Sequence, residues 1–279
     1  MTEPMTLRAR LAAPADAVHR ALTDPAELRV WLAEHAEVEL PHRYAFWGRY
    51  TPSGDAPHQR LLHVDDRTLR FAWLLDGVET STEISLTPEG ESTILTLRQS
   101  HFDFAEAIAE SSVRGVLQTY WSLAITNLAA RLEGRPLLPR TDFTSARLRG
   151  ELLIDAPTDR VYESLTDSEQ ASAWFGYPIG IEPRVGGRYA MGGFDTGYTA
   201  KVVDLEPGRR MSVDWGSPSG VTTWELAESD GKTRLTFVQS GFDERHPPYA
   251  AWSGSVAGLG ELVRYHEMPD WQPIWLPER

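Results

Sequence analysis

The chain has 279 residues, no cysteine and a formal net charge of −13 at pH 7. The lack of cysteine excludes disulfides, thiol nucleophiles and thiolate metal sites. The acidic balance argues against nucleic acid and anionic membrane surfaces as partners. The length suits about two domains of ordinary size. Because no segment reads as a membrane span or as a secretory signal, a cytoplasmic protein is expected.

The first predicted element is a half-buried strand over residues 7–11, where apolar residues alternate with two arginines. Two short helices follow. Pro14 lies near the start of the first helix, where a missing N–H costs little. In the second helix Asp24 suits the N-cap and Glu27 the third position, as in a capping box. Trp31 ends this helix and is expected to be a core residue, not a ligand contact.

Strands and a long helix come next. Residues 69–73 alternate apolar and other side chains, and residues 84–86 and 93–97 form a predicted hairpin around a turn at 88–90. Apolar residues then recur at helical spacing over 117–132. This order predicts an antiparallel sheet with helices on one face, which is the α+β class.

The same order of elements occurs twice. At an offset of 143, residues 12–31 match residues 155–174 at eight of twenty positions, among them Trp31 and Trp174. A second block, from Thr82 to Asp103, matches at an offset of 140. A repeat of this length has the size of a domain, not of a solenoid unit. The chain therefore contains two copies of one domain.

The copies define the predicted boundaries. Residues 1–135 form the first domain, and residues 136–142, in a stretch with one glycine and two prolines, form the linker. Residues 143–279 form the second domain and end in a Trp-rich tail at 271–275. That tail is too apolar to be free in solvent, and we expect it to seal the second domain or the groove between the halves.

Three segments carry a family resemblance. They are the Ala-Pro-x-Asp-x-Val to Leu-Thr-Asp and Trp run of both copies, Pro183-Arg-Val-Gly-Gly-Arg-Tyr189, and Thr233–Phe242. With them the chain resembles the family named for the activator of heat-shock-protein-90 ATPase, C-terminal-like domain, within the START-like (SRPBCC) helix-grip superfamily. Where the Gly-Gly turn is expected, the first copy has residues 42–48, which are rich in aromatic side chains.

The resemblance implies two tandem helix-grip domains. Each would be a curved antiparallel sheet wrapped around a long C-terminal helix, with two short helices after the first strand and a cavity between sheet and helix. Members of the wider superfamily bind lipids, sterols or polyketides there, and a few are cyclases or hydrolases. The eukaryotic co-chaperone carries the domain behind a separate activation domain.

Ten tryptophans are the strongest compositional signal. In a helix-grip arrangement, aromatic side chains of the strands and the long helix would converge and could line an apolar pocket. The alternative is that they fill the space as ordinary core. The predicted ligand-binding residues are Trp215, Trp224, Trp252, Tyr189, Met191, Phe237, Val256, Trp73 and Trp121.

No catalytic residue, metal site or cofactor is predicted. The eight histidines show no ligand spacing, and no Gly-x-Ser-x-Gly elbow occurs. The glycine pairs at 186–187 and 192–193 lack the strand–loop–helix context of a phosphate site and indicate a turn or a bulge. The acids to consider for catalysis are Glu225, Asp243 and Glu244.

The sequence therefore predicts a non-catalytic binding protein that holds a small apolar ligand between sheet and helix. Two alternatives stay open: a polyketide-cyclase-like or hydrolase-like enzyme, and a co-chaperone-like module that binds another protein. A polar group with a perturbed pKa inside a cavity would favour the enzyme. A filled interior with an exposed apolar patch would favour the interaction module.

Overall fold

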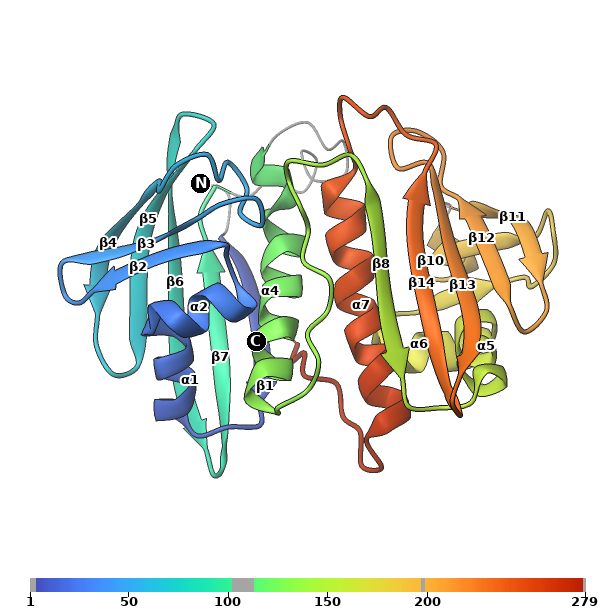
Figure 1. Cartoon of the computed structure of the whole chain (residues 1–279), viewed down its shortest axis with the longest axis horizontal. Coiled ribbons are helices and arrows are strands. Elements are labelled where there is room, and N and C mark those ends of the chain that lie inside the picture. The colour runs from blue at the N-terminus through green and yellow to red at the C-terminus, as the bar shows by residue number, and fades with distance from the viewer. Residues whose placement is uncertain (1–3, 102–112, 197–198, 278–279) are drawn as a thin grey trace. The chain divides into compact units, whose positions relative to one another are not determined.

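The structure is a computed structural model that describes residues 4–101, 113–196 and 199–277. The chain divides into two compact units, Met1–Ser145 together with Ile274–Arg279, and Ala146–Pro273 (Figure 1). Residues 136–145 and 274–279 belong to the first unit. The sequence placed residues 136–142 in a linker and residues 143–145 and 274–279 in the second domain.

The first unit combines two short helices, a five-stranded sheet, a separate hairpin and one long helix. Its sheet has the antiparallel order β1-β7-β6-β5-β4, and β2 and β3 form their own two-stranded sheet. A side chain links the two sheets, since the Phe46 amide donates to Gln59 Oε1 at 3.1 Å. The elements are β1 (Met5–Leu11), α1 (Ala15–Thr23), α2 (Pro25–Trp31), β2 (His35–Glu39), β3 (Arg43–Trp47), β4 (Gln59–Val64), β5 (Thr68–Leu75), β6 (Val78–Glu89), β7 (Ser92–Gln99), η1 (Val113–Val116) and α4 (Leu117–Leu132).

The second unit repeats this order with one continuous sheet. Its seven strands have the antiparallel order β8-β14-β13-β12-β11-β10-β9. The elements are β8 (Leu148–Ile154), α5 (Thr158–Thr166), α6 (Ser168–Phe175), β9 (Ile179–Ile181), β10 (Arg188–Met191), η2 (Phe194–Thr196), β11 (Ala200–Glu206), β12 (Arg210–Asp214), β13 (Val221–Ser229), β14 (Lys232–Ser240) and α7 (Tyr249–Glu267).

The paired glycines of the second copy explain part of this difference. Gly186 and Gly187 lie between β9 and β10, and their backbone exchanges hydrogen bonds with Val202 of β11 at 2.8 and 2.9 Å. A Cβ on Gly187 would lie 2.2 Å from the Glu182 carbonyl oxygen, so this close approach requires glycine. The expected turn therefore extends the β10–β11 pairing that links the β9–β10 hairpin to the rest of the sheet.

The short helices begin as the sequence predicts but lack the complete capping box. Asp24 accepts a hydrogen bond from the Ala26 amide at 2.7 Å. Glu27 does not reach back to the cap as the capping box requires; it forms a two-bond ion pair with Arg131 on α4, at 2.8 and 2.9 Å. The guanidinium is a stronger partner for a carboxylate than a neutral amide, so the long-range pair wins.

The two repeat tryptophans are buried in matched positions. Trp31 is 2% exposed and Trp174 is 5% exposed. Each indole N–H donates to a backbone carbonyl of the preceding short helix, Trp31 to Ala21 at 3.0 Å and Trp174 to Ser164 at 2.8 Å. Both are core residues that fasten the two short helices to each other.

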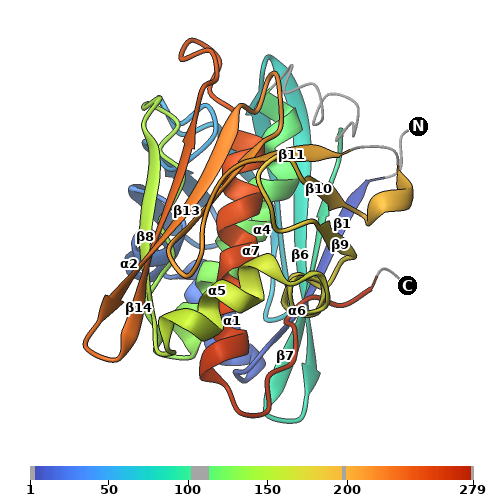
Figure 2. The same cartoon turned by 90° about the vertical axis from the view of Figure 1, so that its right-hand side faces the viewer.

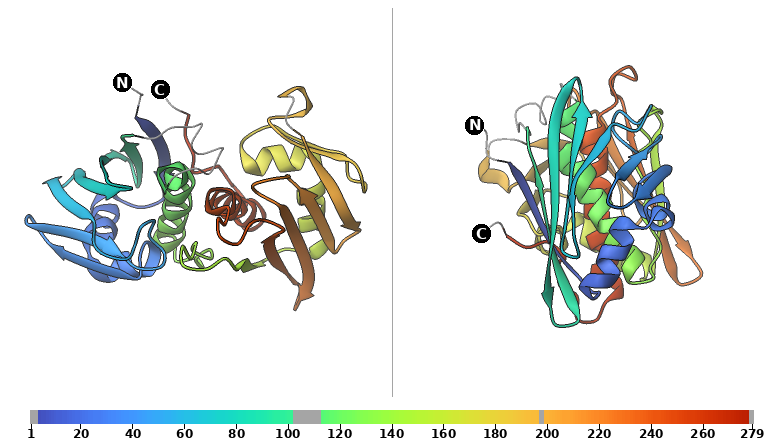
Figure 3. Two further views of the ribbon diagram at one scale, coloured as in Figure 1. Left: turned by 90° about the horizontal axis from the view of Figure 1, so that it is seen from above. Right: turned by 90° about the vertical axis from the view of Figure 1, so that its left-hand side faces the viewer.

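The long helices α4 and α7 pack against the sheets of their own units. Figures 2 and 3 show α7 running along the second sheet and α4 along the first. Ten residues of α4 and nine of α7 are buried. The predicted α+β fold with two tandem helix-grip domains is confirmed. Among the described residues, no helix has the length and apolarity needed to cross a membrane.

Candidate functional site

In the first unit the predicted aromatic residues meet but leave little space. The Trp73 ring on β5 lies 6.1 Å from Trp121 on α4 and 5.2 Å from Phe46 on β3, both edge-to-face. Trp73 is 0% exposed and Trp121 is 1% exposed. Phe71 and Tyr120 pack against the same rings. Interlocked aromatic rings of this kind fill an interior at high density.

A buried glutamine completes this interior. Gln99 at the end of β7 is fully buried, and its Oε1 accepts from the Thr82 hydroxyl at 2.7 Å and from the Trp121 indole at 3.3 Å. These hydrogen bonds tie β6, β7 and α4 together around Gln99, whereas the Trp73 indole nitrogen is buried without a hydrogen-bond partner within the described residues.

In the second unit the predicted residues form one continuous chain of rings. Trp215 follows β12 and lies 5.4 Å from Tyr189 on β10, and Tyr189 stacks with Trp224 on β13 at 6.2 Å. Trp224 contacts Phe237 on β14 at 5.8 Å, and Phe237 stacks on Trp252 of α7 at 4.9 Å. The chain of rings therefore runs from the sheet end to the long helix, with Trp215 half-buried at its outer end.

The two remaining predicted residues of the second unit flank this aromatic chain. Val256 lies one helical turn beyond Trp252 on α7 and is buried. Met191 is half-buried at the end of β10, where it pairs with Ile179. Burial also raises the pKa of the Tyr189 phenol, so this hydroxyl stays neutral in the interior.

A hollow of about 520 Å³ lies at the sheet end where Trp215 emerges. Two loops form it, the connection from β12 to β13 and the segment between β14 and α7. It is lined by Asp214, Gly216, Ser217, Pro218, Gly220, Val221, Gly241, Phe242, Asp243 and His246. None of the nine predicted ligand-binding residues lines the hollow, but Asp214 and Gly216, which precede and follow Trp215 in the sequence, do.

The loop after β12 explains why the hollow exists in this unit. Only two residues, Asp76 and Gly77, join β5 to β6 in the first unit, whereas residues 215–220 join β12 to β13. Trp215 is fixed at the base of the longer loop, where its indole donates to the Thr222 hydroxyl at 2.9 Å and its amide donates to the Gly220 carbonyl at 2.9 Å. The signal in the sequence was the run Gly216-Ser-Pro-Ser-Gly220, which marks a loop but not a cavity.

A second glycine contact fixes how closely the two loops approach. Gly220 has φ +70°, and a Cβ there would lie 2.3 Å from the Ser240 carbonyl oxygen. Gln239, directly before Ser240, donates to the Ser219 carbonyl at 2.8 Å. Its Oε1 is buried and has no hydrogen-bond partner within the described residues. The corresponding Gln99 oxygen of the first unit has two.

Asp243 and His246, which line the hollow, contact each other, whereas the Asp214 carboxylate accepts a hydrogen bond from the Gly216 amide at 2.9 Å. Asp243 accepts two hydrogen bonds from the Arg245 guanidinium at 3.0 and 2.8 Å and lies 3.3 Å from His246 Nδ1. The Arg245 guanidinium holds the pKa of the Asp243 carboxyl well below its usual range. Asp243 is therefore an ionised acceptor at neutral pH, not a proton donor. The other two acids considered from the sequence, Glu225 and Glu244, are exposed.

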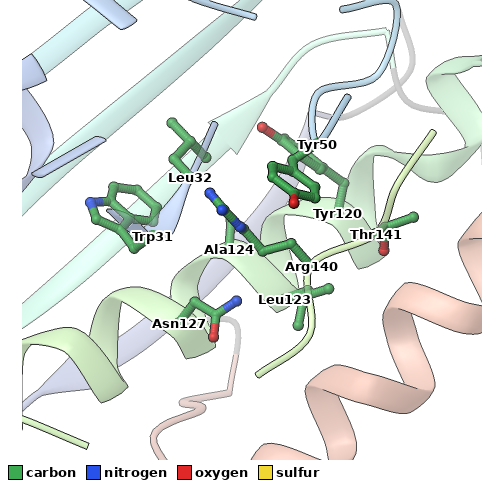
Figure 4. Close-up of a pocket in the computed structure, with 9 residues that line it drawn as sticks. All are labelled: Trp31, Leu32, Tyr50, Tyr120, Leu123, Ala124, Asn127, Arg140 and Thr141. Atoms are coloured by element: carbon green, nitrogen blue, oxygen red, sulfur yellow. The ribbon is translucent and has the colours of Figure 1, made fainter. Parts of the chain in front are cut away.

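A small void lies in the first unit next to residues 140–141, within the stretch predicted to be a linker. Its volume is about 10 Å³, the space of a single water molecule. Figure 4 shows Arg140 reaching back between Trp31 and Tyr50. The guanidinium carbon lies 3.9 Å above the Tyr50 ring, and Nη1 donates to the carbonyls of Arg29 and Ala33 at 3.3 and 3.1 Å. Residues predicted to be a linker thus close this side of the unit.

No group of three or more histidines and acids within the described ranges is arranged to hold a metal ion.

A protein-family model matches the chain in two segments. The model describes the Activator of Hsp90 ATPase homolog 1-like protein, and it matches residues 12–133 and 155–264. The two segments agree with the two copies read from the sequence. Together they cover well over half of the chain.

Several solved structures are similar to the chain. CalU16 from Micromonospora echinospora is 24% identical, with 48% of this chain and 76% of that protein covered and a TM-score of 0.38. A conserved protein of unknown function from Enterococcus faecalis is 25% identical, with 45% and 74% covered and a TM-score of 0.40. DynU16, a protein in the dynemicin biosynthetic locus, is 20% identical, with 95% and 100% covered and a TM-score of 0.39. No curated protein matches the chain.

Proposed function

The chain belongs to the Activator of Hsp90 ATPase homolog 1-like family, and on this premise we propose that it is a non-catalytic binding protein whose second unit holds a small apolar ligand. The ligand enters through the hollow between the β12–β13 loop and the β14–α7 segment and contacts the aromatic chain that begins at Trp215. The first unit serves as a scaffold. The protein acts in the cytoplasm.

The proposal rests on one observation. In the second unit the hollow lies next to the outer end of the aromatic chain. The hollow measures about 520 Å³, and small-molecule pockets typically measure about 300–1,000 Å³. Trp215 is part of the loop that forms the hollow and is also the first ring of a chain that ends at Trp252. A ligand in the hollow is therefore placed next to the outer end of this aromatic chain, through the lining residues Asp214 and Gly216 on either side of Trp215.

The chemistry of the walls favours an apolar ligand. The only polar group of Trp215 is its indole N–H, which is already bonded to Thr222. The charged pair Asp243 and Arg245 satisfies itself at the rim. The apolar side chains that line the hollow are Pro218, Val221 and Phe242, and they lie beside the polar Asp214 and Ser217. This lining suits a mainly apolar molecule with few polar groups.

The interior of the first unit differs from that of the second, and this difference supports separate roles for the two units. Its aromatic residues Trp73 and Trp121 are almost completely buried, and its void of about 10 Å³ is too small for an organic ligand. The nine residues predicted from the sequence thus separate into two groups. Those of the second unit are proposed to bind, and Trp73 and Trp121 are proposed to support.

The test uses a neutral apolar fluorophore, N-phenylnaphthylamine, titrated into the full chain. Val221→Trp places a large side chain in the hollow and is expected to weaken binding by about tenfold or more, the equivalent of ~1.4 kcal/mol. Val203→Trp on β11 is the matched control, because Val203 is 39% exposed and lies outside the hollow. Trp215→Ala should weaken binding similarly, because this half-buried ring is at the outer end of the aromatic chain, next to the hollow.

One result overturns the proposal: binding of the fluorophore that is equal in Val221→Trp, Val203→Trp and the unmodified chain. Trp252→Ala and Trp174→Ala give a second comparison. Both remove a buried indole, but only Trp252 belongs to the aromatic chain, so only its loss should change affinity in protein that stays folded. If no fluorophore binds at all, the protein-interaction alternative becomes the better account, because the first unit's filled interior already agrees with it.

A further inference from the structure

The C-terminal segment of the chain is held at two points. After α7 ends at Glu267, the Trp271 indole donates to Glu261 Oε2 at 3.1 Å, and its ring lies 5.3 Å from Tyr265, edge-to-face. Both partners belong to α7. Pro273 is the last residue of the second unit, and from Ile274 onward the chain belongs to the first unit.

The returning segment extends the first unit's sheet. The Arg10 amide donates to the Ile274 carbonyl at 2.7 Å, and the Leu276 amide donates to the Arg8 carbonyl at 2.9 Å. Trp275 forms an antiparallel bridge with Ala9 of β1. The other side of β1 is paired with β7 along its whole length. The segment is therefore an additional strand on an edge that β1 would otherwise leave open.

A side chain anchors this strand as well as its backbone. Ile274 is 2% exposed and belongs to the same core cluster as Ala9 and Leu11, while Trp275 is partly buried against that cluster. Arg8 adds one contact at the far end, where Nη1 donates to the Pro277 carbonyl at 2.8 Å. The edge thus offers an apolar notch for one aliphatic side chain, beside two backbone hydrogen bonds that flank Trp275.

We propose that the outer edge of β1 is a docking site for an extended peptide, and that residues 274–277 occupy it as a removable latch. The peptide it fits carries a branched aliphatic residue in the notch, an aromatic residue next to it and a free amide one residue later. Recognition is by strand addition, in which main-chain hydrogen bonds supply affinity and alternate side chains supply specificity.

The length of the latch agrees with a detachable strand. Pro273 precedes it and Pro277 ends it, and proline cannot donate a hydrogen bond to a ladder. The backbone pairing is therefore short, with ladder hydrogen bonds at Ile274 and Leu276, whereas β7 pairs with β1 over seven residues. Because the latch is covalently tied to α7, its effective concentration at the edge is about millimolar, and a free peptide at micromolar concentration does not displace it.

The test uses a fluorescein-labelled synthetic peptide with the sequence of residues 273–279, and fluorescence anisotropy with three forms of the full chain. The first form is unmodified, the second carries a specific protease site inserted between Gln272 and Pro273 and is cut after folding, and the third is Ile274→Asp. The cut chain and Ile274→Asp are expected to bind the peptide about 100-fold more tightly than the unmodified chain, since the tethered competitor is lost. A peptide with aspartate in place of isoleucine is the specificity control.

Thermal unfolding keeps the test decisive if Ile274→Asp loses stability. The peptide should raise the Tm of Ile274→Asp and leave that of the unmodified chain unchanged, because only the variant has an open edge. The proposal is overturned if folded cut chain binds no peptide, if the aspartate peptide binds equally well, or if the peptide leaves the Tm of Ile274→Asp unchanged.

Discussion

The two units of this protein have the same fold but different interiors. In the first, Trp73, Trp121 and Gln99 interlock, and the β5–β6 turn is as short as a hairpin allows. In the second, the rings form a chain that leads to a hollow, and a six-residue loop replaces the turn. After a duplication one copy can therefore keep a closely packed interior, while changes in two loops open a hollow in the other copy.

The two units share a core around the matched tryptophans Trp31 and Trp174. The variants Trp31→Ala and Trp174→Ala test whether this core is equally important in both units. Each indole is buried and bonded to the preceding helix, so each loss is expected to cost about 3–5 kcal/mol of unfolding free energy. Chemical denaturation of both variants measures it. A large cost in one unit and none in the other would show that the copies no longer share this core.

The loop difference is tested by a pair of glycines that precede matched strands. Gly77→Ala places a Cβ in open space at φ +73°, whereas Gly220→Ala places one 2.3 Å from the Ser240 carbonyl oxygen at φ +70°. The backbone penalty alone is about 1–2 kcal/mol, and the clash raises the expected cost at Gly220 to about 2–4 kcal/mol. Equal costs in denaturant unfolding would mean that the loops do not define the hollow.

The glutamine pair Gln99 and Gln239 sharpens the contrast between the two interiors. Gln99→Met leaves the Thr82 hydroxyl and the Trp121 indole without their acceptor, so a loss of about 2–3 kcal/mol is expected. Gln239→Met removes one hydrogen bond to Ser219, and about 1 kcal/mol is expected. Thermal unfolding of the two variants measures both losses of stability. A larger loss for Gln239→Met than for Gln99→Met would contradict the expected difference between the two interiors.

The smallest difference concerns acid stability. Arg131 lowers the pKa of Glu27 in the folded first unit, while Gln170 takes this position in the second. A lowered carboxyl pKa stabilises the fold above the ordinary value of about 4.3, and the contribution disappears as the pH falls through the lowered value. Glu27→Gln should therefore cost about 0.2–1 kcal/mol at pH 7 and progressively less below pH ~4. A cost that does not change with pH would assign the effect to packing.

Much of the fold could be read from the sequence because its signals are local or repeated. Trp31 and Trp174 identified the repeat and were correctly expected to be buried, and the helical spacing of residues 117–132 gave α4. The convergence of Trp215, Trp224 and Trp252 onto one aromatic chain agrees with the expected arrangement of strands and helix. Whether they bind a ligand stays a prediction.

What the sequence did not show depends on contacts between distant or irregular segments. The hollow is built by loops 214–221 and 241–246, which have no periodicity from which a position could be read. The partner of Glu27 is Arg131, and a capping box was expected because only the near neighbours are visible in sequence. The tail strand is short and lies between two prolines, so its composition indicates a loop.

The pairing of Arg8 with Pro277 joins residues 269 positions apart, and this has a consequence for synthesis. A ribosome makes the first unit up to Ser145, then the whole second unit, and only then the strand that completes the first. At about 5–20 residues per second, the nascent first unit waits roughly 10 s with the β1 edge and its apolar notch open. Open strand edges promote mispairing between chains, so the step most exposed to aggregation or to chaperone capture falls during translation of the second unit.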